Sequence, residues 1–298
     1  MLAEIASEST GQDTRDLMVV DLHTHSTASD GSETPSALVD MAVSIGLRRL
    51  ALTDHDTQEG IPEARAAAEP ADIELIPGTE LSLDYQGGMH LVVLWLEPGE
   101  GPLQDRLVSL QAGRSQRNAA IVDLLVGLGL PLTLEELAEE GGGGSVGRPH
   151  IAAVMMQKGY VSSVAEAFDL WLSAGKPAYS GRPRMTPEEA ISLAVASGGV
   201  PILAHPHTLG INRADEMARL LTRLRSAGLV GLEAFCAGYR RHEREGYADL
   251  ARRFGLVASG GSDYHGSYKP GLALGTGYGD LEVPDSAVNL LRAHAGRP

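Results

Sequence analysis

The sequence predicts an α/β fold in which about seven strands alternate with helices and an all-helical insertion interrupts the alternation. Short, continuously apolar runs recur along the chain, as is typical of strands that are covered on both faces. Capped helical segments lie between most of these runs, whereas residues 100–182 contain consecutive helices instead. With 298 residues, of which 43% are hydrophobic, the chain favours one domain with an insertion over two independent domains.

The first half of the predicted fold contains four strands, one crossover helix and one hairpin. Residues 34–46 begin with a capping Thr and a Pro at the first helical position and end at a Gly, which predicts a helix between the first two strands. Residues 86–88 are too few for a crossover and predict a hairpin, so the strand that begins near His90 runs antiparallel to its predecessor. The expected strands are 17–22, 49–53, 73–83, 89–96, 200–204, 230–235 and 256–259.

The second half returns to alternation after the insertion. Thr186, with Glu189 three residues later, predicts a capped helix that leads into the strand at 200–204. Residues 214–226 and 241–254 supply the helices before the last two strands.

The insertion is expected to contain four helices. They are predicted at residues 103–128, from a capping box at Thr133, at 149–158 and at 163–174, and the glycines of residues 141–144 predict a flexible joint. An excursion of this length is expected to form a cap over a functional site. The alternative is a surface subdomain without a role there.

The composition limits the classes of partner. A formal charge of −15 argues against a protein whose main affinity is for long duplex nucleic acid. Residues 1–16 are acidic and polar, and we expect a disordered leader and no signal peptide or membrane anchor. The single cysteine, Cys236, lies in an apolar run, so we expect a buried thiol and a cytoplasmic protein. No pattern in the sequence indicates an oligomeric state.

Six of the ten histidines lie in short blocks at the ends of expected strands. Residues two apart on a strand point to the same side, so His23 and His25 can hold one cation, and Asp263 and His265 repeat this geometry. A single such histidine is usually a surface or hydrogen-bonded residue, but the repetition predicts a polynuclear metal site. Carboxylates beside imidazoles suit Zn²⁺, Mn²⁺ or Fe, and the scarcity of thiolates disfavours a structural zinc site.

Five blocks of the sequence, residues 21–31, 50–57, 77–80, 203–206 and 261–266, resemble the four-motif signature of the PHP (polymerase and histidinol phosphatase) family of metal-dependent phosphoesterases. The insertion, with residues 147–150 and 176–179, is similar to that of a bacterial branch. This branch contains nucleoside monophosphate and 3′,5′-bisphosphate phosphatases and 5′-3′ RNA exonucleases. The resemblance implies a distorted (β/α)7 barrel built from residues 17–99 and 183–298, with residues 100–182 as the helical cap.

The resemblance also implies two or three divalent metal ions, Mn, Fe or Zn. One ion would lie among His23, His25, Glu80 and Asp263; Glu80 would bridge to a second ion held by His90 and His205; a third would take Asp30, His55 and His265. Many relatives have histidine where this chain has Asp30, and a carboxylate there favours Mn²⁺ or Fe²⁺. We expect Asp21 and Asp54 to orient imidazoles. Glu233 is either another orienting group or a plain acid at a strand end.

The activity implied is hydrolysis of the phosphate of AMP, of 3′,5′-bisphosphonucleotides or of the 5′ ends of short RNA, by attack of a metal-activated hydroxide. Two alternatives stay open. One is a phosphatase of the histidinol-phosphate type, and the other is a non-catalytic metal-binding module such as those found in DNA polymerases. We expect no membrane partner.

Candidate substrate-binding residues come from the insertion and from the segment after His205. His207 is expected to protonate the leaving alkoxide, although a loop histidine without a role has the same pattern. Arg148, between the glycine run and a Pro-initiated helix, is the strongest candidate for a catalytic phosphate contact. The further substrate-binding candidates are Arg117, His150 and Tyr179, with Arg114, Lys176, Phe168 and Trp171 as additional clamping and stacking groups. The alternatives are a solvated helix face for Arg114 and Arg117 and a helix cap for His150.

Overall fold

The computed structural model describes residues 19–86, 88–142 and 144–296. A seven-stranded sheet follows the order of the chain, and each predicted strand is present. The strands are β1 (Val19–Asp21), β2 (Leu47–Leu52), β3 (Glu74–Ser82), β4 (His90–Leu94), β5 (Val200–Leu203), β6 (Gly231–Cys236) and β7 (Val257–Gly261). The predicted leader, residues 1–16, lies outside the described residues.

The sheet curls into a nearly closed barrel. The backbone N–H of Leu22 donates to the carbonyl of Gly260 at 3.3 Å, and that of His25 to the carbonyl of Tyr264 at 3.0 Å, so the chain after β1 meets β7 and the segment that follows it. Strand β4 pairs antiparallel with both β3 and β5, whereas the other neighbouring pairs are parallel. This confirms the hairpin and the distorted (β/α)7 barrel.

Helices α1 (Pro35–Ser44), α2 (Ile61–Ala68), α7 (Pro187–Ala196), α8 (Ala214–Ser226), α9 (Arg241–Arg253) and α10 (Asp285–Arg292) cover the barrel. The predicted caps at Thr34 and Thr186 are present, since each side chain accepts the backbone N–H three residues later. The sequence-based prediction lacks α2 and α10. Neither helix has a side-chain cap, which is the signal that marks a helix start in a sequence.

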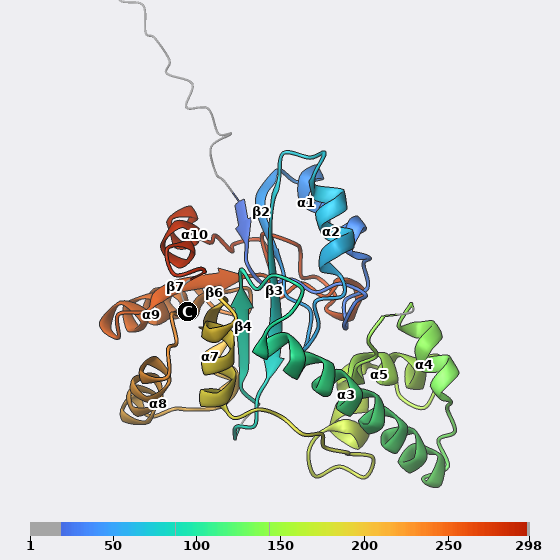
Figure 1. The fold of residues 1–298 in the computed structure, drawn as a ribbon. Coiled ribbons are helices and arrows are strands. Elements are labelled where there is room, and N and C mark those ends of the chain that lie inside the picture. The colour runs from blue at the N-terminus through green and yellow to red at the C-terminus, as the bar shows by residue number, and fades with distance from the viewer. Residues whose placement is uncertain (1–18, 87, 143, 297–298) are drawn as a thin grey trace, which may run out of the picture.

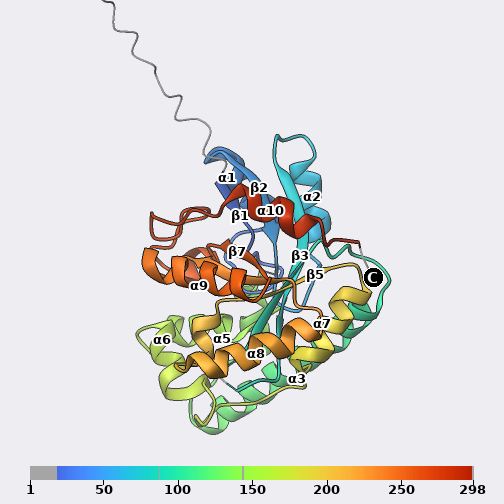
Figure 2. The ribbon, with the colours of Figure 1, turned by 90° about the vertical axis from the view of Figure 1, so that its left-hand side faces the viewer.

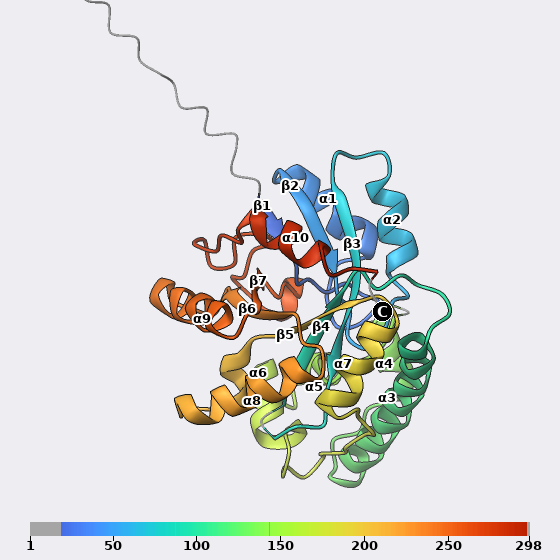
Figure 3. The ribbon, with the colours of Figure 1, turned by 60° about the vertical axis from the view of Figure 1, so that its left-hand side comes forward.

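The insertion contains α3 (Pro102–Gly127), α4 (Leu134–Glu140), α5 (Arg148–Gln157) and α6 (Val164–Ala167). The expected single helix at 163–174 is wrong, because α6 passes into a π-helical turn over Phe168–Leu172. These helices pack on a hydrophobic cluster of their own that includes Ile121, Leu137 and Ile151. They gather at the end of the molecule away from α1 and α2 (Figures 1, 2 and 3).

The insertion contacts the loop that follows β1. The backbone N–H of Ser145 donates to the carbonyl of Ala28 at 3.1 Å. A Cβ on Gly144 would lie 1.6 Å from the carbonyl oxygen of Thr27, so no larger residue fits there. Gly144 is therefore needed for close packing, which the prediction of a flexible joint did not include. The contact places the insertion against the loop that leads to Asp30, which favours the cap over a remote subdomain, while the boundaries at 99/100 and 182/183 stay a prediction.

Within the described ranges, no helix combines the length and the apolar composition that a membrane crossing requires.

Candidate metal centre

The predicted metal ligands come together at one end of the barrel. His23, His25, His55, His205, Asp263 and His265 follow the ends of parallel strands, and Glu80 lies near the end of β3. His90 is the first residue of β4 and pairs with Ser82. Because β4 runs in the opposite direction, its beginning lies at the same edge where the parallel strands end. Barrel enzymes place their chemistry at this edge.

Glu80 stands at the centre of the cluster. Its Oε2 atom lies 3.2 Å from Nε2 of His23, 3.2 Å from Nε2 of His25 and 3.1 Å from Nδ1 of His55. Its Oε1 atom lies 2.9 Å from Nδ1 of His90 and 2.9 Å from Nε2 of His205. The two oxygens of one carboxylate therefore face two different sets of imidazoles, as a bridging ligand requires.

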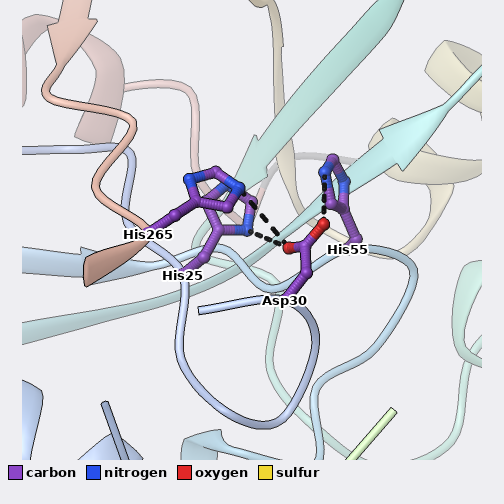
Figure 4. Close-up of side chains that lie close together, drawn as sticks. All are labelled: His25, Asp30, His55 and His265. Carbon is purple, nitrogen blue, oxygen red and sulfur yellow. Dashed lines mark ion pairs between the residues drawn. The ribbon is translucent and has the colours of Figure 1, made fainter. Parts of the chain in front are cut away.

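Asp30 is the centre of a neighbouring group that also contains His25, His55 and His265 (Figure 4). Its Oδ1 atom lies 3.7 Å from Nδ1 of His25 and 3.4 Å from Nε2 of His265, and its Oδ2 atom lies 3.7 Å from Nε2 of His55. The rings of His25 and His265 stack with centroids 4.1 Å apart.

Three sets of donor atoms could each hold an ion, with all atoms of a set within 4.8 Å of one another. They are His23, His25, Glu80 and Asp263; His25, Asp30, His55 and His265; and His55, Glu80 and His90. The first set equals the predicted one, and the second adds His25 to the predicted ligands. In the third, His55 takes the place that was expected for His205, although His205 still contacts Glu80.

Buried imidazole nitrogens without a hydrogen-bond partner show that these residues fit metal ions. Among the described residues, Nε2 of His23, both ring nitrogens of His25 and Nδ1 of His55 make no hydrogen bond of acceptable geometry, although three of these nitrogens lie 3.1–3.2 Å from Oε2 of Glu80. A buried polar atom that lacks a partner is costly, so a ligand for it is expected. Imidazole nitrogens beside carboxylate oxygens suit Mn, Fe or Zn.

Backbone strain also concentrates at this site. Asp56, His205 and Asp263 have φ values of 55°, 24° and 56°, and in the described chain Trp95 is the one other non-glycine residue with positive φ. Such conformations cost about 1–3 kcal/mol each and persist where the surroundings impose them. They aim the side chains of His205 and Asp263 into the cluster.

Three further acids, Asp21, Asp54 and Glu233, lie next to the cluster. Of these, Glu233 orients the predicted metal ligands His23 and His205. Its Oε1 atom lies 2.9 Å from Nδ1 of His23, and its Oε2 atom accepts the backbone N–H of His205 at 2.6 Å. With Nδ1 engaged in this way, Nε2 of His23 is directed to Glu80. This geometry supports the orienting alternative over a plain acid at a strand end.

The expectation that Asp21 and Asp54 orient imidazoles is wrong. Asp21 accepts the backbone N–H groups of Ser262 and Gly275, each at 2.8 Å. Asp54 accepts the hydroxyls of Ser26 at 2.7 Å and Ser29 at 2.6 Å. These carboxylates hold the loops that carry the ligands, because loop N–H and hydroxyl groups lie closer to them than any imidazole.

The electrostatics couple the imidazoles to the carboxylates. Burial lowers the pKa of His25, but Asp263 and Glu80 raise it more, and the resulting pKa is about 9. His23 behaves in the same way, with a pKa well above its ordinary value. Burial lowers the pKa of His55 to about 3 despite Asp30 and Glu80. Without metal, the neighbouring carboxylates therefore favour the protonated forms of His23 and His25.

Metal binding is expected to release protons. A ligating imidazole must be neutral, so an ion that binds His25, whose pKa is about 9, displaces a proton at pH 7.5. The apparent affinity for Mn²⁺ should then rise with pH up to about 9. Titration calorimetry in buffers of different ionisation enthalpy measures the released protons. His242→Ala, on the exposed surface of α9, should behave as wild type, and Mn²⁺ binding without proton release would contradict the assignment.

A cavity of about 370 Å³ opens beside the cluster, and His207 lines it together with His205 and Lys269. Nδ1 of His207 lies 3.0 Å from the hydroxyl of Tyr239, which also accepts the backbone N–H of His207 at 3.1 Å. Burial, and then His205, lower the pKa of His207. Tyr239 thus fixes the ring and leaves Nε2 for a group in the cavity.

Four guanidinium groups meet where the insertion touches the barrel. Arg114 and Arg117 are only 5% and 6% exposed, so the alternative of a solvated helix face is wrong. Arg114 and Arg182 both bind Asp56, and Arg117 donates to Asn118 on its own helix.

Arg148 lies at the edge of this group. It donates to the carbonyl of Ser180 at 3.3 Å, and its guanidinium lies 5.0 Å from the ring centroid of Tyr179. The predicted candidates Arg148 and Tyr179 are therefore in contact with each other, while Lys176 is exposed to solvent.

The other insertion candidates have local contacts. Nδ1 of His150 accepts the backbone N–H of Gly147 at 2.9 Å, which is the helix-capping alternative. Phe168 and Trp171 pack against the insertion's own hydrophobic cluster, so the structure does not place these expected stacking groups at the cavity.

Asp56, Arg182, Tyr239 and Lys269 are absent from the sequence-based prediction. Asp56 follows Asp54 by two residues, and this spacing is the one signal that could have indicated it. The others are single residues outside any block, and packing alone brings them to the site.

Comparisons with known proteins agree with this geometry. The family model described as the PHP domain matches residues 21–115. The chain is 38% identical, over 82% of its length and 89% of the relative, to a 5′-3′ exoribonuclease of Haemophilus influenzae. It is 31% identical, over 86% of its length and 90% of the relative, to a 3′,5′-nucleoside bisphosphate phosphatase of Chromobacterium violaceum. A structure from Bifidobacterium adolescentis, described as a metal-dependent phosphoesterase, aligns with a TM-score of 0.81 and 30% identity over 93% of this chain and 96% of that one.

A barrel with this cluster at the ends of its strands defines a metal-dependent phosphoesterase. The chain belongs to the PHP family and is a phosphoric ester hydrolase. The alternative of a non-catalytic module is thereby set aside.

Proposed function

We propose that the protein hydrolyses phosphate esters of small nucleotides that carry more than one phosphate, such as 3′,5′-bisphosphonucleotides, or of the 5′ ends of short RNA, and that AMP is a poorer substrate. The observation that carries this proposal is a cluster of four arginines beside the metal cluster. We call it the arginine cluster; its members are Arg114, Arg117, Arg148 and Arg182. Names of relatives support it, because an exoribonuclease and a bisphosphate phosphatase are among them.

The arginine cluster carries more positive charge than the neighbouring carboxylates neutralise. Burial, and then the guanidiniums of Arg114, Arg148 and Arg182, lower the pKa of Arg117 to about 8, against the opposing effect of Asp56. Nε of Arg114, of Arg148 and of Arg182 has no partner among the described residues. Burying uncompensated charge is costly, so an anion is the expected occupant. Arginine forks suit phosphate oxygens.

This anion site adjoins the metal cluster. Nη2 of Arg114 lies 3.3 Å from the carbonyl oxygen of His55. A Cβ on Gly147 would lie 3.4 Å from Nη1 of Arg114 and 3.5 Å from Cβ of Asp30, so only a glycine separates the two groups. A substrate with two phosphates can therefore place one at the ligands and another at the arginines. Histidinol phosphate offers a single phosphate and a cationic amine, which the arginines would repel.

The chain's residues divide the chemistry among them. His23, His25, Glu80 and Asp263, with Asp30, His55, His90, His205 and His265, would hold two or three Mn, Fe or Zn ions. When bound, such ions activate water, hold phosphate oxygens and stabilise the leaving oxygen. Arg148 and Arg117 bind phosphate, and Nε2 of His207 gives a proton to the leaving alkoxide. Cys236 takes no part, because burial raises the pKa of its thiol well above the ordinary value.

A substrate panel tests the proposal. With Mn²⁺ present, kcat/KM should be about tenfold or more higher for adenosine 3′,5′-bisphosphate or a 5′-phosphorylated RNA oligomer than for AMP, since each charge-assisted phosphate contact is worth about 1.5–3 kcal/mol. Histidinol phosphate should be the poorest substrate. A preference for histidinol phosphate, or no hydrolysis of any of the four with Mn²⁺, Fe²⁺ or Zn²⁺, would reject the proposal.

Replacing Arg148 by alanine is expected to raise KM for nucleotides about tenfold, because one charge-assisted phosphate contact is lost. Bound metal should stay at the wild-type level, since Arg148 contacts no ligand. Steady-state kinetics and elemental analysis check both statements. Arg241→Ala, whose side chain is 90% exposed on α9, is the matched control, and an unchanged KM for the bisphosphate would remove Arg148 from the site.

A further inference from the structure

We propose that Lys269 is a phosphate-binding residue of this active site and that its ammonium group donates to an oxygen of the phosphate in the cavity. Lys269 directly follows the short 3₁₀ helix Gly266–Tyr268, in the segment after β7. It belongs to none of the histidine blocks. The inference rests on the proposed function, because the phosphate must bind at the ligand cluster.

Lys269 contacts one oxygen of the Asp263 carboxylate and leaves the other oxygen available to a metal ion. Its Nζ atom pairs with Oδ2 of Asp263 and also donates to the carbonyl oxygen of Asp263 at 3.2 Å. Oδ1 of Asp263 faces the opposite way, 3.6 Å from Nε2 of His23 and 3.4 Å from Nε2 of His25. Asp263 can therefore serve as a ligand through Oδ1 while Lys269 stays on Oδ2.

One N–H of the ammonium group stays available. Lysine has three N–H donors, and Asp263 accepts two of them. The side chain is 37% exposed and lines the cavity together with His205 and His207. The third donor is thus left for a group that enters this cavity.

The charge around the cavity makes this donor significant. Among the described residues that line it, Lys269 is the one lysine or arginine, while Glu80, Glu233 and Asp263 contribute carboxylates. A phosphate dianion that approaches meets these acids, and a fixed cation at the wall offsets their repulsion. The arginine cluster does not line this cavity. Lys269 and the arginine cluster would therefore bind different phosphates or different oxygens of one phosphate.

An orienting role for Lys269 makes the opposite prediction for metal affinity. If Lys269 only positions Asp263, its loss should weaken Mn²⁺ binding. If Lys269 binds phosphate, its loss removes a cation that competes with Mn²⁺ for the charge of Asp263, and Mn²⁺ affinity should stay the same or rise. The two roles are therefore separated by sign.

The test is Lys269→Met in the Mn²⁺-loaded full chain, with inorganic phosphate as the probe. Calorimetry should show phosphate affinity about tenfold or more weaker than in wild type, with Mn²⁺ affinity unchanged or higher. Lys269→Arg should recover part of the phosphate affinity, because the charge is restored. Lys158→Met, a lysine of the insertion that pairs with Glu136, is the matched control and should bind phosphate as wild type does.

A second comparison uses the Arg117→Ala background, which removes one of the arginines proposed to bind phosphate, and the loss caused by Lys269→Met should persist there. Unchanged phosphate affinity in Lys269→Met, or a loss that accompanies weaker Mn²⁺ binding, overturns the assignment of Lys269 alone. Wild-type protein that binds no Mn²⁺ or hydrolyses no phosphate ester overturns the proposed function itself, and this result precedes any variant.

Discussion

Replacing Glu80 by glutamine is expected to remove both bound metal and turnover. Glu80 presents its two oxygens to five imidazoles at 2.9–3.2 Å, and the amide nitrogen of glutamine cannot serve as a ligand oxygen. Loss of a mere hydrogen-bond partner of a ligand costs about 10–100-fold in affinity or activity, so loss of this ligand should reduce kcat by more than about 100-fold. Elemental analysis and Mn²⁺-supported turnover measure the two effects.

Glu74→Gln is the matched control for Glu80→Gln. Glu74 begins the same strand at the opposite end and pairs with Arg49 and Arg292, so its replacement should leave metal content and turnover intact. His23→Ala and Asp263→Ala should follow Glu80→Gln, and chelators should abolish activity that Mn²⁺ restores. Wild-type protein with less than about one equivalent of transition metal and no response to Mn²⁺ would contradict the metal centre.

The second large effect is expected for His207→Ala, which should lower kcat on AMP by about 100-fold or more and spare p-nitrophenyl phosphate. General acid catalysis typically contributes about 10²–10⁴-fold where the leaving group needs a proton. A nucleoside alkoxide needs one as the P–O bond breaks, whereas p-nitrophenolate leaves without it. Parallel assays of kcat on the two substrates, with metal content measured in each preparation, decide the matter.

Tyr239→Phe is the companion variant, because it removes the hydroxyl 3.0 Å from Nδ1 of His207 and keeps the ring. It should reduce kcat on AMP by less than His207→Ala does and again spare p-nitrophenyl phosphate. Equal losses on both substrates in His207→Ala, with metal retained, would show that His207 binds phosphate or positions the cluster.

The sequence by itself predicted the strands and the histidines and carboxylates that gather at the candidate metal centre. Strands covered on both faces are recognisable as apolar runs, and the two-residue spacing of His23 and His25, or of Asp263 and His265, sets side chains on one side of the chain locally. Capping residues such as Thr34 mark helix starts in the sequence, because the capping hydrogen bond joins residues only three positions apart. These features depend on neighbours in the chain, so they can be predicted without a tertiary structure.

Only the tertiary structure decided which partners the remaining polar groups find. Arg114 and Arg117 have the spacing of an exposed helix face, but packing of the insertion on the barrel buries them beside Asp56 and Arg182. Asp21 and Asp54 bind loop atoms where imidazoles were expected, while Glu233 orients His23, 210 residues away. Lys269 reaches Asp263 because the chain turns back after β7. Such contacts join groups that are distant in sequence or lie in irregular segments, so no local pattern encodes them, and the closure of the barrel brings them together.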